Sequence, residues 1–167
     1  LSIYVDDTDR RAAEEAVRRS EAMLKHLVDT SPDVITLTDL STGRYLLVND
    51  SFARITGYEK SQVVGRTSIE LGIWADPAVR EEMVERLRHD GQVQDLPTRF
   101  VNRAGQPVAM RVSAARFHQD RREFLVISAR DVSETERNRL ERDAILETAT
   151  IGIAVTREQR FVMANPG

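Results

Sequence analysis

Residues 34–65 read VITLTDLSTGRYLLVNDSFARITGYEKSQVVG, and this stretch decides the fold. It opens with the β-branched and leucine-rich segment 34–38 and returns through the apolar segment 45–48. Between them, Ser41-Thr42-Gly43 supplies turn residues, so the pattern predicts a β-hairpin.

Two short helices should follow this hairpin directly. Asn49 is the first of three capping residues, and it precedes a helix that carries Phe52 and Ile55 and ends at Gly57. A second helix is expected over 60–64. The hairpin therefore leads into compact helical cover rather than into another strand.

A longer helix begins further along the chain at Asp76-Pro77, where a cap residue precedes proline at the first helical position. Its apolar positions recur at helical spacing until Gly91. They are Val79, Met83 and Leu87.

The period then changes to two, which indicates strands. Strands are expected over 98–102, from Val108 onward and over 124–132, with turns at 104–105 and 120–122. In the middle strand one face should carry Val108, Met110, Val112 and Ala114. The order of elements predicts an α+β fold, an antiparallel five-stranded sheet with helices packed on one face.

Helices also flank this body. Residues 10–28 place a narrow apolar seam at alternating spacings of three and four, with charged residues on both sides. The seam residues are Ala13, Val17, Ser20, Leu24 and Leu27. They form either the contact of a parallel helix dimer or the buried face of an ordinary globular helix. Ser133 and Glu136 have capping-box spacing and predict the start of the outgoing helix.

Composition narrows the class of protein. The chain has 167 residues with 24 Lys and Arg against 27 Asp and Glu, a formal charge of −3. This charge gives no electrostatic reason to expect nucleic acid or an anionic membrane as partner. No apolar run approaches the ~20 residues of a membrane span, and without cysteine no disulfide, zinc-thiolate or cysteine chemistry is possible. The chain opens at Leu1 rather than Met, so we expect a segment of a longer protein.

The sequence also repeats itself. The second copy keeps the order of the first with a turn two residues shorter, and its helix entry at Asp131-Val132-Ser133 echoes Asp6-Asp7-Thr8. The repeated residues are Thr30, Ile35, Thr38, Arg44 and Asn49, which return as Thr148, Ile153, Thr156, Arg160 and Asn165. The chain is thus expected to hold the tail of one unit, a whole unit and the first hairpin of a third. We expect Ile151–Met163 to be disordered or paired with another chain, since a lone hairpin cannot bury its apolar side.

Short motifs spread over the whole unit resemble the PAS family. They are Asn49-Asp50-Ser51-Phe52, Gly57-Tyr58, Val63-Val64-Gly65, Asn102-Arg103-Ala104-Gly105 and the closing Asp131-Val132-Ser133. Glu59 departs from the pattern, because a Ser or Thr cap is usual there, and this predicts a frayed helix after Tyr58.

The resemblance implies a division of the chain into five segments. These are 1–9, the tail of a preceding PAS unit; 10–28, a linker helix; 29–133, the PAS domain; 134–148, a second linker helix; and 149–167, the truncated start of a further unit. Tandem PAS arrays are typical of bacterial sensor histidine kinases and cyclic-dinucleotide enzymes, so the resemblance implies a slice of such a sensor with an output domain in cis. The segment is expected in the cytoplasm, within a protein that is either soluble or membrane-anchored.

No catalytic or metal-ligating set emerges from the residues. His26, His89 and His118 fall on separate elements, and the acidic residues near Glu81 are spaced as a solvated, ion-paired helix face. The chain lacks a phosphate loop, a zinc motif, a phosphoacceptor-histidine box and a cyclase signature. Enzymatic output is therefore expected outside these residues.

PAS domains often hold a ligand between sheet and helices. Where flavin-binding members carry amides, this sequence has Phe100, Met110 and Ala129, and the haem-ligand position falls near Glu81 rather than at a histidine. Neither cofactor is expected; the core is either simply filled or open to a small apolar or weakly polar ligand. The candidate lining is Ile35, Leu37, Val48, Phe52, Ile55, Trp74, Met83, Leu87, Phe100, Met110, Val112 and Ile127.

Three functions stay open at this point: a signal-relaying module, a ligand-free dimerisation spacer with the same fold, and an enzyme with a hidden polar cluster. In the first, Asp131, Ser133 and Glu136 couple the last strand to the outgoing helix, and the linker helices join two copies. No cofactor is required by any of these expectations.

Overall fold

The computed structural model describes residues 6–148, 154–157 and 160–164. The chain forms two compact units, one ending at Arg130 and one beginning at Asp131. Parts of the predicted segments 1–9 and 149–167 lie outside the described residues. None of the helices in the described ranges is long and apolar enough to cross a membrane.

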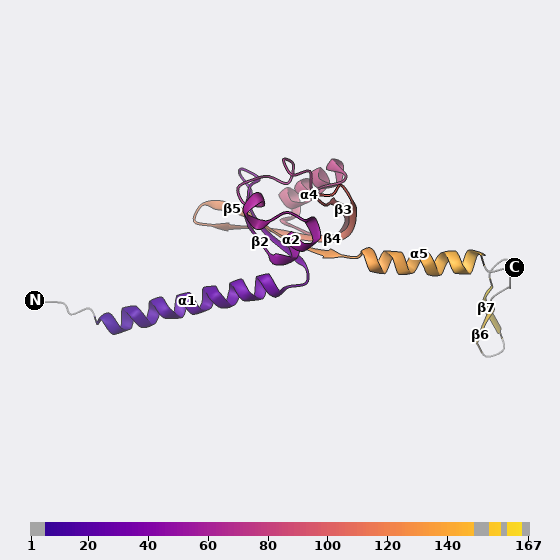
Figure 1. Cartoon of the computed structure of the whole chain (residues 1–167), viewed down its shortest axis with the longest axis horizontal. Helices are drawn as coiled ribbons and strands as arrows, with labels where there is room; N and C mark the ends of the chain where they lie inside the picture. The colour runs from indigo at the N-terminus through magenta and orange to yellow at the C-terminus, as the bar shows by residue number, and fades with distance from the viewer. Residues whose placement is uncertain (1–5, 149–153, 158–159, 165–167) are drawn as a thin grey trace, which may run out of the picture. The chain divides into compact units, whose positions relative to one another are not determined.

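The first unit contains a long helix, a five-stranded sheet and three shorter helices (Figure 1). The helices are α1 (Asp7–Thr30), α2 (Asp50–Thr56), α3 (Lys60–Val63) and α4 (Pro77–Asp90). The strands are β1 (Val34–Asp39), β2 (Tyr45–Val48), β3 (Gln92–Val101), β4 (Pro107–Gln119) and β5 (Arg122–Asp131). The predicted α+β fold and element order are confirmed.

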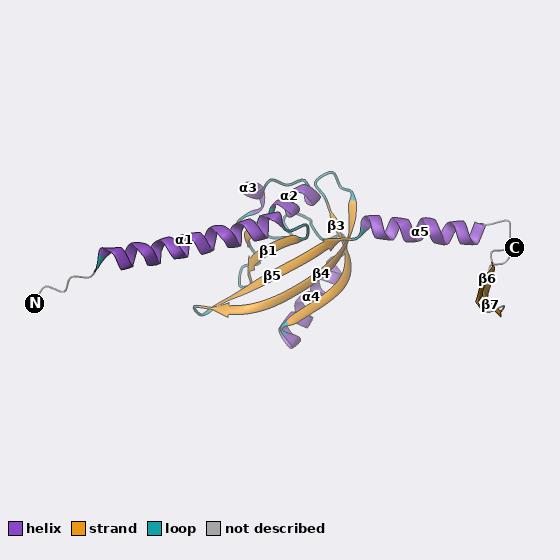
Figure 2. Cartoon of the chain, turned by 90° about the horizontal axis from the view of Figure 1, so that it is seen from below, coloured by secondary structure: helices purple, strands orange, loops and turns teal. Residues whose placement is uncertain are grey.

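The sheet has the strand order β2-β1-β5-β4-β3, so the first and last strands in sequence lie side by side at its centre. β1 pairs antiparallel with both β2 and β5, and β3 with β4. Figure 2 shows the strands in front with α4 behind them. Val34, Val112 and Ala129 have no solvent exposure on the inner face, where the core lies.

The edge strand β3 starts at Gln92, six residues before the predicted Thr98. Two features interrupt its alternation: Asp95 has φ 52°, and the register with β4 shifts between Val93 and Leu96. Pro97 also has no N–H to donate, which an edge strand tolerates. The bulge therefore hid the first half of the strand from the sequence pattern.

The helix α3 is better ordered at its start than predicted. Glu59 and Gln62 form a capping box, in which the Gln62 side chain accepts the backbone N–H of Glu59 at 3.2 Å. A Glu/Gln pair thus replaces the usual Ser or Thr cap, and the expected fraying is corrected.

The second unit consists of α5 (Ser133–Thr148) and the hairpin of β6 (Ala154–Arg157) and β7 (Arg160–Ala164). Part of 151–163 lies outside the described residues, and the described part forms the hairpin that the sequence repeat predicted. Its register reproduces the first hairpin: Thr38 pairs with Tyr45 and Thr156 with Phe161, each beside a register shift. The sequence repeat is therefore also a repeat of strand register.

Candidate functional site

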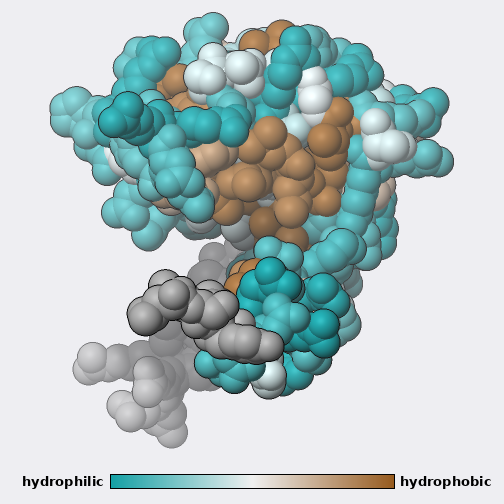
Figure 3. Space-filling view, turned by 90° about the vertical axis from the view of Figure 1, so that its left-hand side faces the viewer, coloured by the Kyte–Doolittle hydropathy of each residue, from teal (hydrophilic) through white to brown (hydrophobic). Residues whose placement is uncertain are grey.

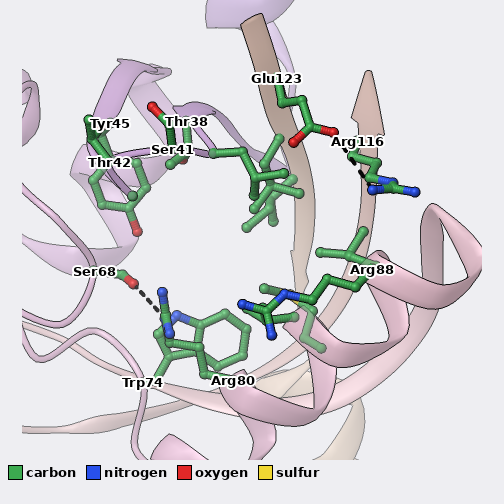
Figure 4. Close-up of a pocket in the computed structure, with 17 residues that line it drawn as sticks. Thr38, Ser41, Thr42, Tyr45, Ser68, Trp74, Arg80, Arg88, Arg116 and Glu123 are labelled. Atoms are coloured by element: carbon green, nitrogen blue, oxygen red, sulfur yellow. Dashed lines mark hydrogen bonds and ion pairs between the residues drawn. The ribbon is translucent and has the colours of Figure 1, made fainter. Parts of the chain in front are cut away.

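A cavity of about 510 Å³ lies between the sheet and α4 (Figure 4). Its walls come from β1, β2 and the turn between them, from β4 and β5, from the segment before α4 and from α4 itself. The lining residues are Thr38, Leu40, Ser41, Thr42, Gly43, Tyr45, Ser68, Trp74, Arg80, Met83, Val84, Leu87, Arg88, Arg116, Glu123, Leu125 and Ile127.

One wall is the β1–β2 turn, which Asp39 holds in place. Its carboxylate accepts the backbone N–H of Ser41 at 2.9 Å and of Thr42 at 3.3 Å, and also the Ser41 hydroxyl. Arg122 on β5 adds an ion pair. The Ser41 hydrogen bonds, followed by the Arg122 pair, hold the pKa of Asp39 well below its usual value. The turn is thus tied to the central strand by a charged group.

Polar groups border the cavity between β2 and α4. Arg80 donates its Nε–H to Ser68 Oγ at 3.2 Å, and the Tyr45 hydroxyl lies on the same side of the cavity (Figure 4). Burial raises the pKa of Tyr45, against the opposing effects of Ser68 and of the Arg80 charge. The hydroxyl therefore stays protonated and keeps its capacity to donate.

Positive charge dominates the lining, which holds the guanidinium groups of Arg80, Arg88 and Arg116 and the single carboxylate of Glu123. Arg116 lies 3.7 Å from Glu123, and Arg88 lies 3.2 Å from Glu85, outside the lining. Arg80 has no ion-pair partner among the residues that the structure describes. The lining thus combines apolar side chains with an excess of positive charge.

The structure brings together only part of the predicted apolar lining. Trp74, Met83, Leu87 and Ile127 line the cavity. Five others are buried in the core away from it, and Ile55 packs against that core as a partly buried side chain. The five buried core residues are Val48, Phe52, Phe100, Met110 and Val112.

Ile35 and Leu37 correct the prediction, because they lie on the opposite face of the sheet. Side chains alternate along a strand, and β1 turns Val34, Thr36 and Thr38 inward. The more apolar residues of β1 therefore face outward, and its inward polar residue Thr38 lines the cavity.

Apolar side chains on the outer side of the sheet are partly exposed within the described unit. Leu47, which pairs with Leu37, is 39% exposed. Phe117 and Phe124 stack there with ring centroids 5.4 Å apart. Figure 3 shows apolar surface gathered on one face of the molecule.

Asn49 is a fully buried hub that joins three elements. Its Oδ1 accepts the N–H of Ile35 at 2.9 Å and of Phe52 at 3.1 Å, which caps α2. Its Nδ2 donates to the carbonyls of Val28 and Asp33, each at 2.9 Å. Every bonding position of the amide is used, and the end of α1 is thereby fixed to β1 and α2.

An ion-pair cluster supports the same junction. Lys60 on α3 lies 2.6 Å from Asp29 at the end of α1, which also pairs with Lys25 at 3.1 Å. The Lys60 hydrogen bond, followed by that of Lys25, lowers the pKa of Asp29. Arg130 on β5 pairs with Asp33 at 3.2 Å, so both cavity-lining central strands are held near the α1 terminus.

The proposed coupling residues lie at the start of α5. The Asp131 carboxylate accepts the backbone N–H of Ser133 at 2.9 Å, and Glu136 donates its N–H to the Val132 carbonyl at 2.9 Å. The helix therefore begins with Val132 at the backbone cap position, and the Asp131 carboxylate is a side-chain acceptor for its first turn. Sequence spacing placed the cap one residue too late.

The predicted seam lies on exposed surface of α1, which contains no buried residue. Val17 is 57% exposed, and Leu24 and Leu27 are each 59% exposed. Ala13 and Ser20 are also exposed. In the single chain nothing among the described residues covers this stripe.

Sequence reasoning missed the arginines of the cavity. Arg88 read as part of a solvated, ion-paired helix face, because long charged side chains on a helix usually are, and Arg80 was not singled out. Their spacing carried a signal, since Arg80 precedes Met83 by three positions and Leu87 by seven and so lies beside the apolar stripe. Arg116 likewise continues the inward register of Val112 and Ala114.

The positions that bear on cofactor binding are apolar. Phe100, Met110 and Ala129 are all buried. Among the described residues that line the cavity there is no Asn, Gln, His or Cys. Within the described ranges no group of three or more His, Cys, Asp or Glu could hold a metal ion.

Comparison with known proteins gives the same fold. The family model described as "PAS fold" matches residues 22–132, more than half of the chain. The virulence sensor protein BvgS of Bordetella pertussis is 35% identical over 78 residues, which is 47% of this chain and 6% of BvgS. The chain thus spans a small fraction of the length of that relative.

Solved structures agree. A PAS domain from a two-component sensor histidine kinase has a TM-score of 0.60 at 18% identity, covering 69% of this chain and 98% of that domain. The PAS domain of an HTR-like protein from Haloarcula marismortui has a TM-score of 0.60 at 24% identity, covering 72% and 98%. At these identities the likeness shows the fold alone.

Proposed function

The chain belongs to the PAS family, and we propose that its whole unit is a sensory relay in a bacterial signalling protein. A change in the cavity alters the two helices that flank the unit, and these act on an output domain in cis, a histidine kinase or a diguanylate cyclase. Similarity to PAS domains of sensor proteins supports the sensory role.

One observation carries this proposal: the cavity is lined by the two strands that continue into the flanking helices. Thr38 on β1 and Ile127 on β5 both face it. β1 follows α1 after a break of three residues, and β5 leads through Val132 into α5. A change in the packing around the cavity therefore acts on strands that lead directly to α1 and to α5. Relay of this kind requires two discrete packings that differ by a few kcal/mol.

The experiment is an Asp131→Ala substitution in the intact signalling protein. Loss of the carboxylate removes the acceptor for the Ser133 N–H at the start of α5, so the output should no longer follow the signal while the fold is retained. Glu134→Ala is the matched control, because it removes an acidic group three residues further on, in the first turn of α5. Unchanged signal response with Asp131→Ala, in a protein that unfolds normally, contradicts the relay.

A second candidate function is a ligand-free dimerisation spacer. The exposed apolar seam of α1 favours it, since this surface suits a second copy of the chain. The two functions differ in one measurement: a spacer keeps the same thermal stability across a panel of metabolites, and a ligand-binding relay does not.

A further inference from the structure

We propose that the cavity binds a small organic carboxylate, with its anionic group on Arg80 and its apolar body against Trp74, Met83 and Leu87. This inference rests on the proposed sensory function and names the ligand class of the same cavity. It replaces the apolar or weakly polar ligand that the sequence alone suggested.

Arg80 is the main evidence for an anionic ligand, because no carboxylate among the described residues forms an ion pair with its guanidinium group. The side chain is half-buried and lies beside the cavity (Figure 4). Its Nε–H is used by Ser68, and its two terminal nitrogens have no hydrogen-bond partner among the described residues. A guanidinium presents donors in a planar fork that matches a carboxylate.

The other charged groups of the cavity do not supply the missing anion. Glu123 lies 3.7 Å from Arg116 and 2.6 Å from His118, so its charge is already shared. Arg88 has Glu85 as its partner on the exposed side of α4. Three guanidinium groups against one carboxylate leave the lining with excess positive charge, which favours an anionic ligand.

The remaining walls define the rest of the ligand. The Tyr45 hydroxyl and Ser68 lie next to Arg80 and add neutral hydrogen-bonding groups. Across the cavity Leu125 and Ile127 offer apolar surface. A volume of about 510 Å³ is within the range of small-molecule sites, and it suits a ligand of one or two rings.

The test is calorimetric titration of the 167-residue chain with benzoate, 3-phenylpropionate and indole-3-acetate, each against its neutral amide. At least one carboxylate should bind, and its amide should bind roughly tenfold more weakly or worse. Failure of all three carboxylates at millimolar concentration, or equal affinity of acid and amide, overturns the proposal.

Variants then assign the preference to one side chain. Arg80→Gln should remove most of the difference between acid and amide. Arg86→Gln is the matched control on the same helix, because Arg86 pairs with Glu82 and does not line the cavity. An unchanged acid preference in folded Arg80→Gln overturns the assignment, and the acid–amide comparison in the unmodified chain remains decisive if that variant does not fold.

Failure of this inference is distinguishable from failure of the proposed function. If a carboxylate binds but the output of the intact protein ignores it, the site stands and the relay for that ligand fails. If no carboxylate binds while Asp131→Ala still abolishes the signal response, the relay stands and the ligand class is wrong.

Discussion

Asn49 shows at the scale of one residue how a buried polar group can hold a fold together. It reads in sequence as a helix cap, and it does cap α2. The same amide also binds the ends of α1 and β1, which sequence spacing could not reveal because these partners lie far away in the chain. Buried amides with every bond made are costly to replace.

Asn49→Ala should lower the free energy of unfolding by about 3 kcal/mol, since it leaves buried backbone groups of Ile35, Phe52 and Val28 without their partner. Urea unfolding followed by circular dichroism measures the loss. Asn102→Ala is the control, because its two bonds lie in an exposed turn, and it should cost about 1 kcal/mol or less. If the two variants lose the same free energy of unfolding, Asn49 is not the residue that joins α1, β1 and α2.

Asp39 predicts a dependence of stability on pH. Its pKa is lower in the folded chain than the unfolded value of about 3.9, so it stabilises the fold above that pH. This contribution is lost as the pH falls through the folded pKa. Asp39→Asn should therefore be less stable than the parent at neutral pH, and the gap should narrow below about pH 3.9 in urea unfolding. If the difference in unfolding free energy between the parent and Asp39→Asn does not change with pH, the Asp39 carboxylate does not stabilise the fold through its charge.

At the scale of elements, the sequence predicted the type and order of the helices and strands but not every face. β1 alternates the apolar Ile35 and Leu37 with two threonines, so Ile35 and Leu37 looked like core residues although Thr36 and Thr38 face inward. Period alone cannot choose the inner face of such a strand, because a neighbouring strand and helix decide it.

The charged part of the cavity lining escaped prediction for a related reason. Its arginines come from α4 and β4, and no local pattern shows that these elements meet around a space. Three residues of the candidate lining, Trp74, Met83 and Leu87, do line the cavity, and Met83 and Leu87 lie at the helical spacing that marks the buried side of α4. Charged residues beside that stripe need the fold before they can be placed.

The exposed seam of α1 predicts a change of mass. If two chains associate along it, Leu24→Glu places a charge in the contact and should shift the protein from dimer to monomer in multi-angle light scattering. Met23→Glu is the control, since Met23 is 65% exposed and lies outside the seam. If the parent chain is a monomer, or if the Leu24→Glu variant is still a dimer, the α1 seam is not the contact between two chains.

At the scale of the whole molecule, the repeated register indicates a chain built from similar units. The pairing of Thr156 with Phe161 copies that of Thr38 with Tyr45. We propose that β6 and β7 begin a further PAS unit, so that α5 is a connector between two sensory bodies. A relay in such a chain needs no reactive group, because a change of packing in one unit can alter the helix that leads to the next.

The most direct test of this relay is a double-mutant cycle in the intact signalling protein, with the output activity as readout. Val84→Phe fills part of the cavity from α4, and Val64→Phe is its control at a 47% exposed site away from the lining. If the cavity acts on the output through α5, Val84→Phe changes the output by itself but has no effect once Asp131→Ala is present. Equal effects of Val84→Phe in both backgrounds would contradict it.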